Sequence, residues 1–278
     1  MNVHCGLSLS LSLLSLTFLL SPLSESAVDS FIYAGCSQLR YSPDPTSPFE
    51  SNLDSILTSL VNSASTAPFN NFKISVPGSG PGDAVYGLYQ CRGDLSGPDC
   101  RRCVAAAVAR LAATCPGAVG ATLQLDGCLV RYDNASFLGQ EDRAVASDRC
   151  GPAAAAGGDL LARKDGVLTY LAAGAQYFRV AVSGEVRGVA QCTGDLSGGE
   201  CQDCVAEAIQ RLRNECASSL WGDMFLGKCY ARYSERGYTS SSENDDGVEK
   251  TLAIFIGLIA ALAKIQSVIA DLGYSEEP

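Results

Sequence analysis

Apolar residues follow two kinds of pattern along the chain. Uncharged apolar runs occupy residues 7–20 and 251–263, near the two ends of the sequence. Between them, apolar residues recur every three or four positions, the spacing that places them on one face of an amphipathic helix. The clearest such stripe consists of Val104, Ala107, Val108, Leu111 and Cys115. The central region is therefore predicted to fold into amphipathic elements around a hydrophobic core.

The same stripe occurs again 101 residues later, as Val205, Ala208, Ile209, Leu212 and Cys216. Further helices are expected at 49–64 and 159–174, and strand-like sequences follow the two stripes at 121–132 and 222–233. Helices that cover one face of an antiparallel sheet form an α+β fold. Each repeat is accordingly predicted to contain two helices packed on an antiparallel β-sheet.

Cysteine positions define the repeat most sharply. The spacing Cys-x8-Cys-x2-Cys-x11-Cys-x12-Cys begins at Cys91 and recurs without insertion from Cys192. One more cysteine precedes each block, so the first repeat has Cys36, Cys91, Cys100, Cys103, Cys115 and Cys128, and the second has Cys150, Cys192, Cys201, Cys204, Cys216 and Cys229. A period of about 100 residues is the length of a domain. The chain is therefore interpreted as two tandem cysteine-rich domains, at 27–138 and 142–238.

The amino-terminal apolar run is typical of a secretory signal peptide, here residues 1–26, because small residues stand at Ser24 and Ser26 before the expected cleavage point. Cys5 is lost with this peptide, so twelve of the thirteen cysteines remain. An even number of cysteines in an exported protein predicts disulfides, three in each domain. Six cysteines allow fifteen connectivities, and the sequence alone does not choose among them.

Composition excludes several classes of function. The only histidine, His4, leaves with the signal peptide, which removes Ser-His-Asp and Cys-His catalysis and every histidine-containing metal site. Zinc held by the two Cys-x2-Cys pairs is the alternative to disulfides, but their separation and an oxidising compartment disfavour it. A net charge of −10 argues against a nucleic-acid partner. We expect no catalytic residue, no metal ion and no cofactor.

The carboxyl-terminal region has two interpretations. Residues 239–250 form an acidic linker, 251–273 are the apolar segment and 274–278 are a short tail. The uninterrupted run of 251–263 is shorter than the roughly 20 residues of a membrane span, and extending it to 273 includes Lys264 and Asp271. The segment is therefore either a transmembrane helix or an apolar helix that lies on a membrane or binds a partner.

Two short motifs have both a functional and a structural interpretation. Arg92-Gly93-Asp94 resembles an adhesion sequence, but its counterpart in the second repeat begins with Thr193, so the shared feature is a turn. Asn134 begins an Asn-Ala-Ser sequon and is either a glycosylation site or part of an unmodified turn.

Four other residues are singled out by their place in the repeats. Arg131 and Arg232 occupy equivalent positions after the last cysteine of each repeat, which favours a structural ion pair at a strand end. Trp221 and Tyr230 occur in the second repeat only, so that domain is expected to provide an aromatic contact surface.

The cysteine pattern resembles the plant cysteine-rich domain of ginkbilobin-like antifungal proteins and of cysteine-rich receptor-like kinase ectodomains. Two such domains after a signal peptide, followed by one apolar segment and no kinase, resemble plasmodesmata-located proteins over most of residues 30–272. The resemblance implies a non-catalytic module in the apoplast, anchored in the plasma membrane at plasmodesmata through 251–273, that regulates cell-to-cell traffic and callose deposition. A secreted lectin-like defence protein that binds cell-wall glycans is the alternative.

The resemblance also implies particular residues. Its disulfides would be Cys36–Cys115, Cys91–Cys100, Cys103–Cys128, Cys150–Cys216, Cys192–Cys201 and Cys204–Cys229. Antifungal relatives bind mannose through an Asn, an Arg and a Glu, and the matching positions here hold Ser37, Thr122 and Asp133, then Gly151, Asp223 and Ser234. Since only Asp133 keeps the chemistry, mannose binding is not expected. The expected partners are another cell-wall glycan, a partner ectodomain, or a further copy of the chain.

A short connection joins the two predicted domains. About seven residues separate Phe137 from the expected start of the second domain near Val145, and they are not rich in glycine or serine. Such a connection is too short for independent motion of the domains. A fixed tandem arrangement with one composite surface is therefore predicted.

Overall fold

The computed structural model describes residues 27–41, 48–75, 83–154, 158–174 and 176–236. The predicted signal peptide, acidic linker, apolar segment 251–273 and tail lie outside these ranges. Within them, no helix combines the length and the apolar character that crossing a membrane requires.

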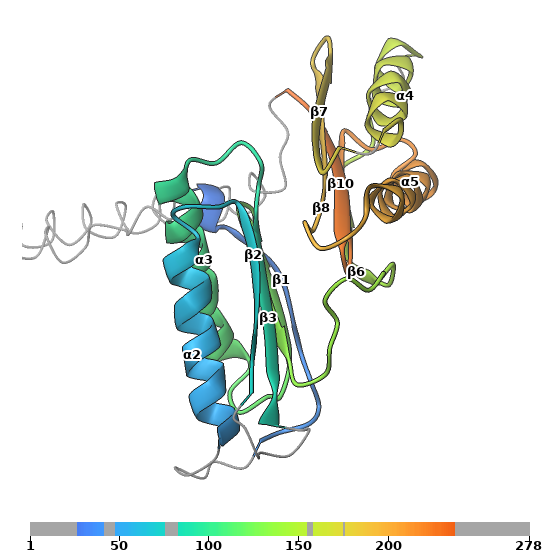
Figure 1. Ribbon diagram of the computed structural model, residues 1–278. Helices are drawn as coiled ribbons and strands as arrows, with labels where there is room; N and C mark the ends of the chain where they lie inside the picture. The colour runs from blue at the N-terminus through green and yellow to red at the C-terminus, as the bar shows by residue number, and fades with distance from the viewer. Residues whose placement is uncertain (1–26, 42–47, 76–82, 155–157, 175, 237–278) are drawn as a thin grey trace, which may run out of the picture.

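The first domain is a five-stranded antiparallel sheet in the order β1-β4-β5-β3-β2, with two helices on one face (Figure 1). Its strands are β1 (Phe31–Cys36), β2 (Phe69–Ile74), β3 (Val85–Cys91), β4 (Ala121–Leu125) and β5 (Cys128–Asp133), and a short 3-10 turn, η1 (Ala27–Asp29), precedes them. The helices are α2 (Pro48–Ser63) and α3 (Gly97–Thr114).

The second domain repeats this arrangement in the order β6-β9-β10-β8-β7. Its strands are β6 (Val145–Cys150), β7 (Phe178–Ser183), β8 (Val186–Cys192), β9 (Trp221–Leu226) and β10 (Cys229–Glu235), and its helices are α4 (Gly158–Ala172) and α5 (Gly198–Glu215). In Figure 1 the two sheets lie between the helices of the first domain and those of the second. The expected α+β fold of two tandem domains is confirmed.

The predicted stripes form the contact between helix and sheet. Val104, Ala107 and Leu111 of α3 are at most 1% exposed, and Ala208, Ile209 and Leu212 of α5 are equally buried. Each helix begins where a serine caps it, because the hydroxyl oxygens of Ser96 and Ser197 accept hydrogen bonds from backbone amides of the first turn. Packing of this face, together with the cap, accounts for both helices.

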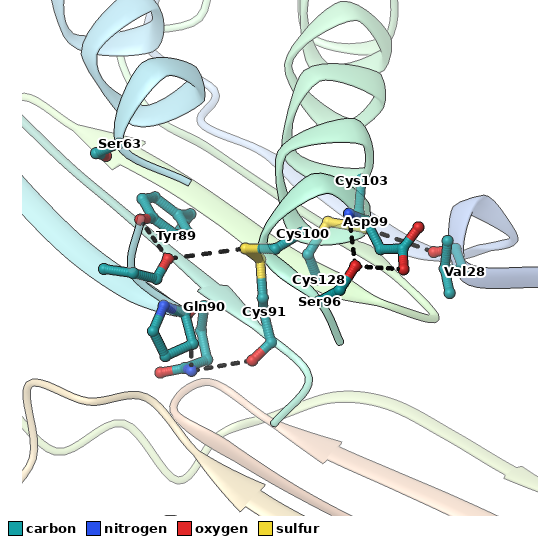
Figure 2. The surroundings of a disulfide bond; sticks show 12 residues. Val28, Ser63, Tyr89, Gln90, Cys91, Ser96, Asp99, Cys100, Cys103 and Cys128 are labelled. Atoms are coloured by element: carbon teal, nitrogen blue, oxygen red, sulfur yellow. Dashed lines mark hydrogen bonds between the residues drawn. A yellow bond between two sulfur atoms is a disulfide. The ribbon is translucent and has the colours of Figure 1, made fainter. Parts of the chain in front are cut away.

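Six disulfides join these helices to their sheets. In each domain one disulfide ties the first strand to the end of the long helix, and two tie the start of that helix to central strands; Figure 2 shows the Cys91–Cys100 bond between β3 and α3. The pairs are Cys36–Cys115, Cys91–Cys100, Cys103–Cys128, Cys150–Cys216, Cys192–Cys201 and Cys204–Cys229, the same pairs that the resemblance implies.

Candidate functional site at the junction of the two domains

In the first domain, the positions that correspond to the mannose-binding residues of the antifungal relatives make local hydrogen bonds. The Ser37 hydroxyl oxygen accepts a hydrogen bond from the Leu39 amide at 3.2 Å, and Asp133 Oδ1 accepts one from the Ala135 amide at 3.0 Å. Both side chains therefore stabilise the turns that follow β1 and β5. The third position of this domain, Thr122, lies in β4.

In the second domain two of the three positions are covered or neutralised, and the third, Ser234, lies in β10. The Trp221 indole packs on Gly151, where any Cβ would overlap the ring. Asp223 is 4% exposed at its side chain and pairs with Arg232 at 2.8 Å and with Arg149 at 3.4 Å. A carboxylate held by two arginines has little capacity left for the hydroxyl groups of a sugar, which agrees with the expectation that mannose is not the ligand.

Two other sequence features have a place in the structure. Asn134 is half-buried in a bend directly after β5, and its glycosylation stays a prediction. Across the described residues, no group of three or more His, Cys, Asp and Glu side chains is placed to hold a metal ion.

A chain of alternating charges crosses from the first domain to the second. Arg92 pairs with Asp94 at 2.7 Å and with Asp126, and Asp126 then pairs with Arg232 at 2.6 Å. Arg232 continues to Asp223 within its own domain. Burial alone would lower the pKa of Arg232, but the two carboxylates raise it above its ordinary value. The arginine and aspartate of the adhesion-like sequence are thus parts of the ion-pair network at the junction.

Equivalent glutamines provide further hydrogen bonds across the boundary. Gln191 Nε2 donates to the Cys91 carbonyl at 2.9 Å, and Gln90 Oε1 accepts from the Gly194 amide at 2.9 Å. Gln90 and Gln191 each directly precede the first cysteine of their motif. The two domains therefore meet around an approximate two-fold relation, with the same element of each domain on either side.

Glycines of the two turns permit this close approach. A Cβ at Gly93 would overlap the Phe178 ring of β7, and a Cβ at Gly194 would lie 2.7 Å from the Phe69 ring of β2. Real Cβ atoms essentially never come so close to a neighbour. Each domain thus inserts its glycine turn against the first residue of an edge strand of the other.

Aromatic side chains fill the centre of the junction. The Tyr33 and Phe225 rings meet edge-on with centroids 5.9 Å apart, and Phe225 also packs on Tyr230 at 5.1 Å. The Tyr230 hydroxyl donates to Gln191 Oε1 at 3.0 Å, and burial raises the pKa of both tyrosines. The second domain thus provides an aromatic contact surface, but Tyr230 faces the first domain, and Trp221, which is 3% exposed, is not part of that surface.

A buried ion pair fixes the connection between the domains. Lys228 and Asp195 pair with side chains 1% and 4% exposed, and Asp195 Oδ2 also accepts the Gly139 amide at 2.9 Å. Phe137 lies between two cations, with its ring centroid 5.1 Å from Lys228 Nζ and 4.4 Å from the Arg131 guanidinium carbon. Burial would raise the pKa of Asp195, but its hydrogen bonds hold that pKa below the ordinary value.

Residues of both domains also line a small cavity at the junction, among them Gln90, Arg92, Gln191 and Tyr230. Its volume is about 20 Å³, which is room for about one water molecule and far less than a sugar ring occupies. The groups here bind one another. What the junction can do is hold two domains at a defined angle, so that their outer surfaces act together.

Residues 35–135 and 161–236 match the protein family described as salt stress response/antifungal. Plasmodesmata-located protein 6 of Arabidopsis thaliana is 54% identical to the chain over 257 residues, 88% of each protein. The chain belongs to the plasmodesmata-located protein family. Plasmodesmata-located protein 7 of the same plant is 52% identical over 244 residues, 86% of this chain and 80% of that protein.

A solved structure extends the family likeness to the arrangement of the domains. The tandem DUF26 ectodomain of the Arabidopsis thaliana cysteine-rich receptor-like protein PDLP8 is 42% identical, with a TM-score of 0.71 over 76% of this chain and 100% of that chain. That relative is an ectodomain solved on its own. The corresponding part of this family member, residues 27–236, contains both sheets and all six disulfides and is the unit used in the experiments below.

Sequence reasoning missed the residues that join the domains in this family member. It placed Arg131 and Arg232 in ion pairs, and the structure pairs Arg131 with Asp142 at 3.1 Å and Arg232 with Asp126. It did not single out Gln90 or Gln191. Their signal was present, since a glutamine precedes the first motif cysteine in both repeats, but nothing in that pattern says that the two side chains face each other.

Proposed function

We propose that this protein is a membrane-anchored binding module at plasmodesmata, with both domains in the apoplast, and that it regulates cell-to-cell traffic and callose deposition without catalysis. The observation that carries the proposal is the 54% identity to plasmodesmata-located protein 6 along 88% of both chains. An alignment of this length includes both domains and the connection between them.

The junction supports a role in binding. Its hydrogen bonds and ion pairs join the two domains to each other, so a ligand would contact outer surfaces that both domains contribute. A ligand or partner ectodomain that spans both domains would depend on their relative orientation. Anchoring is proposed to occur through 251–273.

A second candidate is a secreted defence protein that binds a cell-wall glycan. The observation that favours it is 34% identity over 240 residues to the antimicrobial ginkbilobin-2-like protein of Castanea crenata, 81% of this chain and 96% of that protein. Against it, only Asp133 keeps the chemistry of the mannose-binding positions, and Asp223 is held by arginines.

Imaging in leaf epidermis separates the two functions. The full chain carries a fluorescent protein inserted after residue 240, in the expected linker, and callose is stained in the same tissue. Fluorescent puncta in the cell wall that coincide with callose, more callose and slower spread of a mobile fluorescent reporter are the expected results. A matched chain that ends at residue 250 should be found throughout the apoplast. Diffuse apoplastic fluorescence from the full chain would contradict the proposal and favour the secreted defence protein.

A further inference from the structure

Along the sheet edge formed by β7, some backbone amides and carbonyls pair with no other strand of the described residues. The Cys192 amide donates to the Tyr177 carbonyl at 2.9 Å, and hydrogen-bonded pairs alternate along an antiparallel ladder. Consequently the backbone amides and carbonyls of Arg179 and Ala181 point toward β8. Those of Val180 and Val182 point away from it. Among the described strands, β7 is the last of its sheet.

Apolar side chains flank this edge on both faces of the sheet. Val180 and Val182 are 37% and 67% exposed on the face opposite the helices. On the helical face, Tyr170 of α4 is 57% exposed, and its ring lies 4.9 Å from the Arg179 guanidinium carbon. An extended strand placed beside β7 would cover all three side chains while it paired with the backbone.

The equivalent edge of the first domain is protected. In β2 the residues that match Val180 and Val182 are Asn71 and Lys73, both exposed. A lysine on an edge strand is a common device against strand addition, because a further strand would bury its charge. The Lys73 ammonium also lies 5.3 Å from the ring of Tyr86, its partner on the neighbouring strand β3.

The two remaining edge strands, β1 and β6, contact each other at the junction. Of the four sheet edges that the structure describes, two therefore meet inside the molecule and one carries a lysine. The β7 edge is left without either safeguard.

We propose that β7 pairs with β7 of a second copy of this chain in an antiparallel, two-fold symmetric dimer. With the axis beside Ala181, Val180 lies opposite Val182 of the second copy, and their outward amides and carbonyls form the new ladder. The two Arg179 side chains do not lie opposite each other, because each Arg179 pairs with Ser183 of the second copy, and its guanidinium donates to the Leu171 carbonyl of its own chain at 2.8 Å.

A second copy fits this edge for two reasons. The strand is self-complementary, since the same short apolar sequence is presented in both directions. Since the described residues leave a single open edge, assembly also stops at two, because each dimer uses up the edges that formed it. The inference does not depend on where in the cell the protein acts.

Sedimentation of the ectodomain, residues 27–236, tests the dimer with a matched pair of variants. V182K adds to β7 the charge that β2 already has, and N71K adds the same charge to β2. The wild type should dimerise reversibly, V182K should raise the dimer dissociation constant by at least about tenfold, and N71K should behave as the wild type. Val182 is exposed, so the thermal unfolding of V182K should match that of the wild type.

A third variant tests the backbone contact itself. V180P removes an amide that points away from β8, so the fold keeps its β7–β8 hydrogen bonds while the new ladder loses one donor. V180P should be monomeric. The proposal is overturned if the wild type is monomeric at every concentration, if V182K and V180P dimerise as the wild type does, or if N71K weakens the dimer as strongly as V182K. Occupation of the edge by another partner would give the first of these results.

Discussion

At the scale of single residues, the Asp195–Lys228 pair is the feature of the junction whose disruption costs the most free energy. Both charges are buried, and Asp195 also binds the Gly139 amide of the interdomain connection. Removing one partner of a buried pair leaves the other charge without compensation, and this costs more than the pair itself contributes.

Lys228→Met should therefore lower the free energy of unfolding of the second domain by about 3–5 kcal/mol. The double variant Asp195→Asn, Lys228→Met should lose less than the sum of the two single variants. Denaturant titration of residues 27–236 measures both. Arg236→Met is the control, because Arg236 and Glu185 form a pair 83% and 55% exposed, and its effect should be under about 1 kcal/mol. Equal effects of the buried and the surface variant would contradict this account.

The same pair makes stability depend on pH. The folded-state pKa of Asp195 lies below its unfolded value of about 3.9, so the unfolded chain binds more protons as pH falls. The stabilisation is present in full above that value and is lost as pH falls through the folded pKa. Between about pH 5 and pH 3, the wild type should lose more stability than Asp195→Asn does. Parallel curves for the two proteins would show that this carboxylate is not the group responsible.

At the scale of elements, the long helices were predictable and most strands were not. The stripes at Val104 and Val205 placed α3 and α5 because those faces are fully buried, and the expected helix at 49–64 differs from α2 by one residue at each end. The strands at the sheet edges gave no such signal. In β6, for instance, every residue is at least partly exposed, so its sequence has no apolar alternation.

Helix caps provide a comparison between the repeats. The Ser197 hydroxyl oxygen accepts from the Glu200 amide, and the Glu200 carboxylate in turn accepts from the Ser197 amide at 2.7 Å, which makes a complete capping box. In α3 the Asp99 carboxylate instead accepts from the Ser96 hydroxyl at 2.6 Å. The shorter aspartate side chain does not reach back to the cap's own amide.

Ser197→Ala should consequently destabilise the protein by about 1–2 kcal/mol, and Ser96→Ala should cost at least as much. Ser96→Ala removes two side-chain hydrogen bonds, whereas in Ser197→Ala the Glu200 carboxylate keeps its bond to the backbone amide of residue 197. Thermal unfolding of the two variants, compared with the wild type, measures the difference. Ser55→Ala, at an exposed position inside α2, is the control and should be neutral or slightly stabilising. The interpretation fails if Ser96→Ala is clearly less damaging than Ser197→Ala, or if either is as neutral as Ser55→Ala.

At the scale of the whole molecule, linker length predicts that the domains are held together, but it does not say by which side chains. The Asp126–Arg232 pair joins residues 106 positions apart, and no local pattern relates them. For the same reason, the expectation of an aromatic contact surface at Tyr230 did not say that this surface faces the first domain. An aromatic residue on the outer face of a sheet looks alike in sequence whether solvent or another domain covers it.

The central claim is that the two domains form one rigid unit. Small-angle X-ray scattering of residues 27–236, at concentrations below the dissociation constant of the proposed dimer, tests it most directly, because the distribution of interatomic distances responds to the separation of the domains. We expect a single compact distribution that matches the arrangement in Figure 1, with Gly194→Val, which places a bulky side chain against Phe69, as the variant that broadens it. A broad distribution of interdomain distances in the wild type itself, unchanged in Gly194→Val, would contradict the rigid unit.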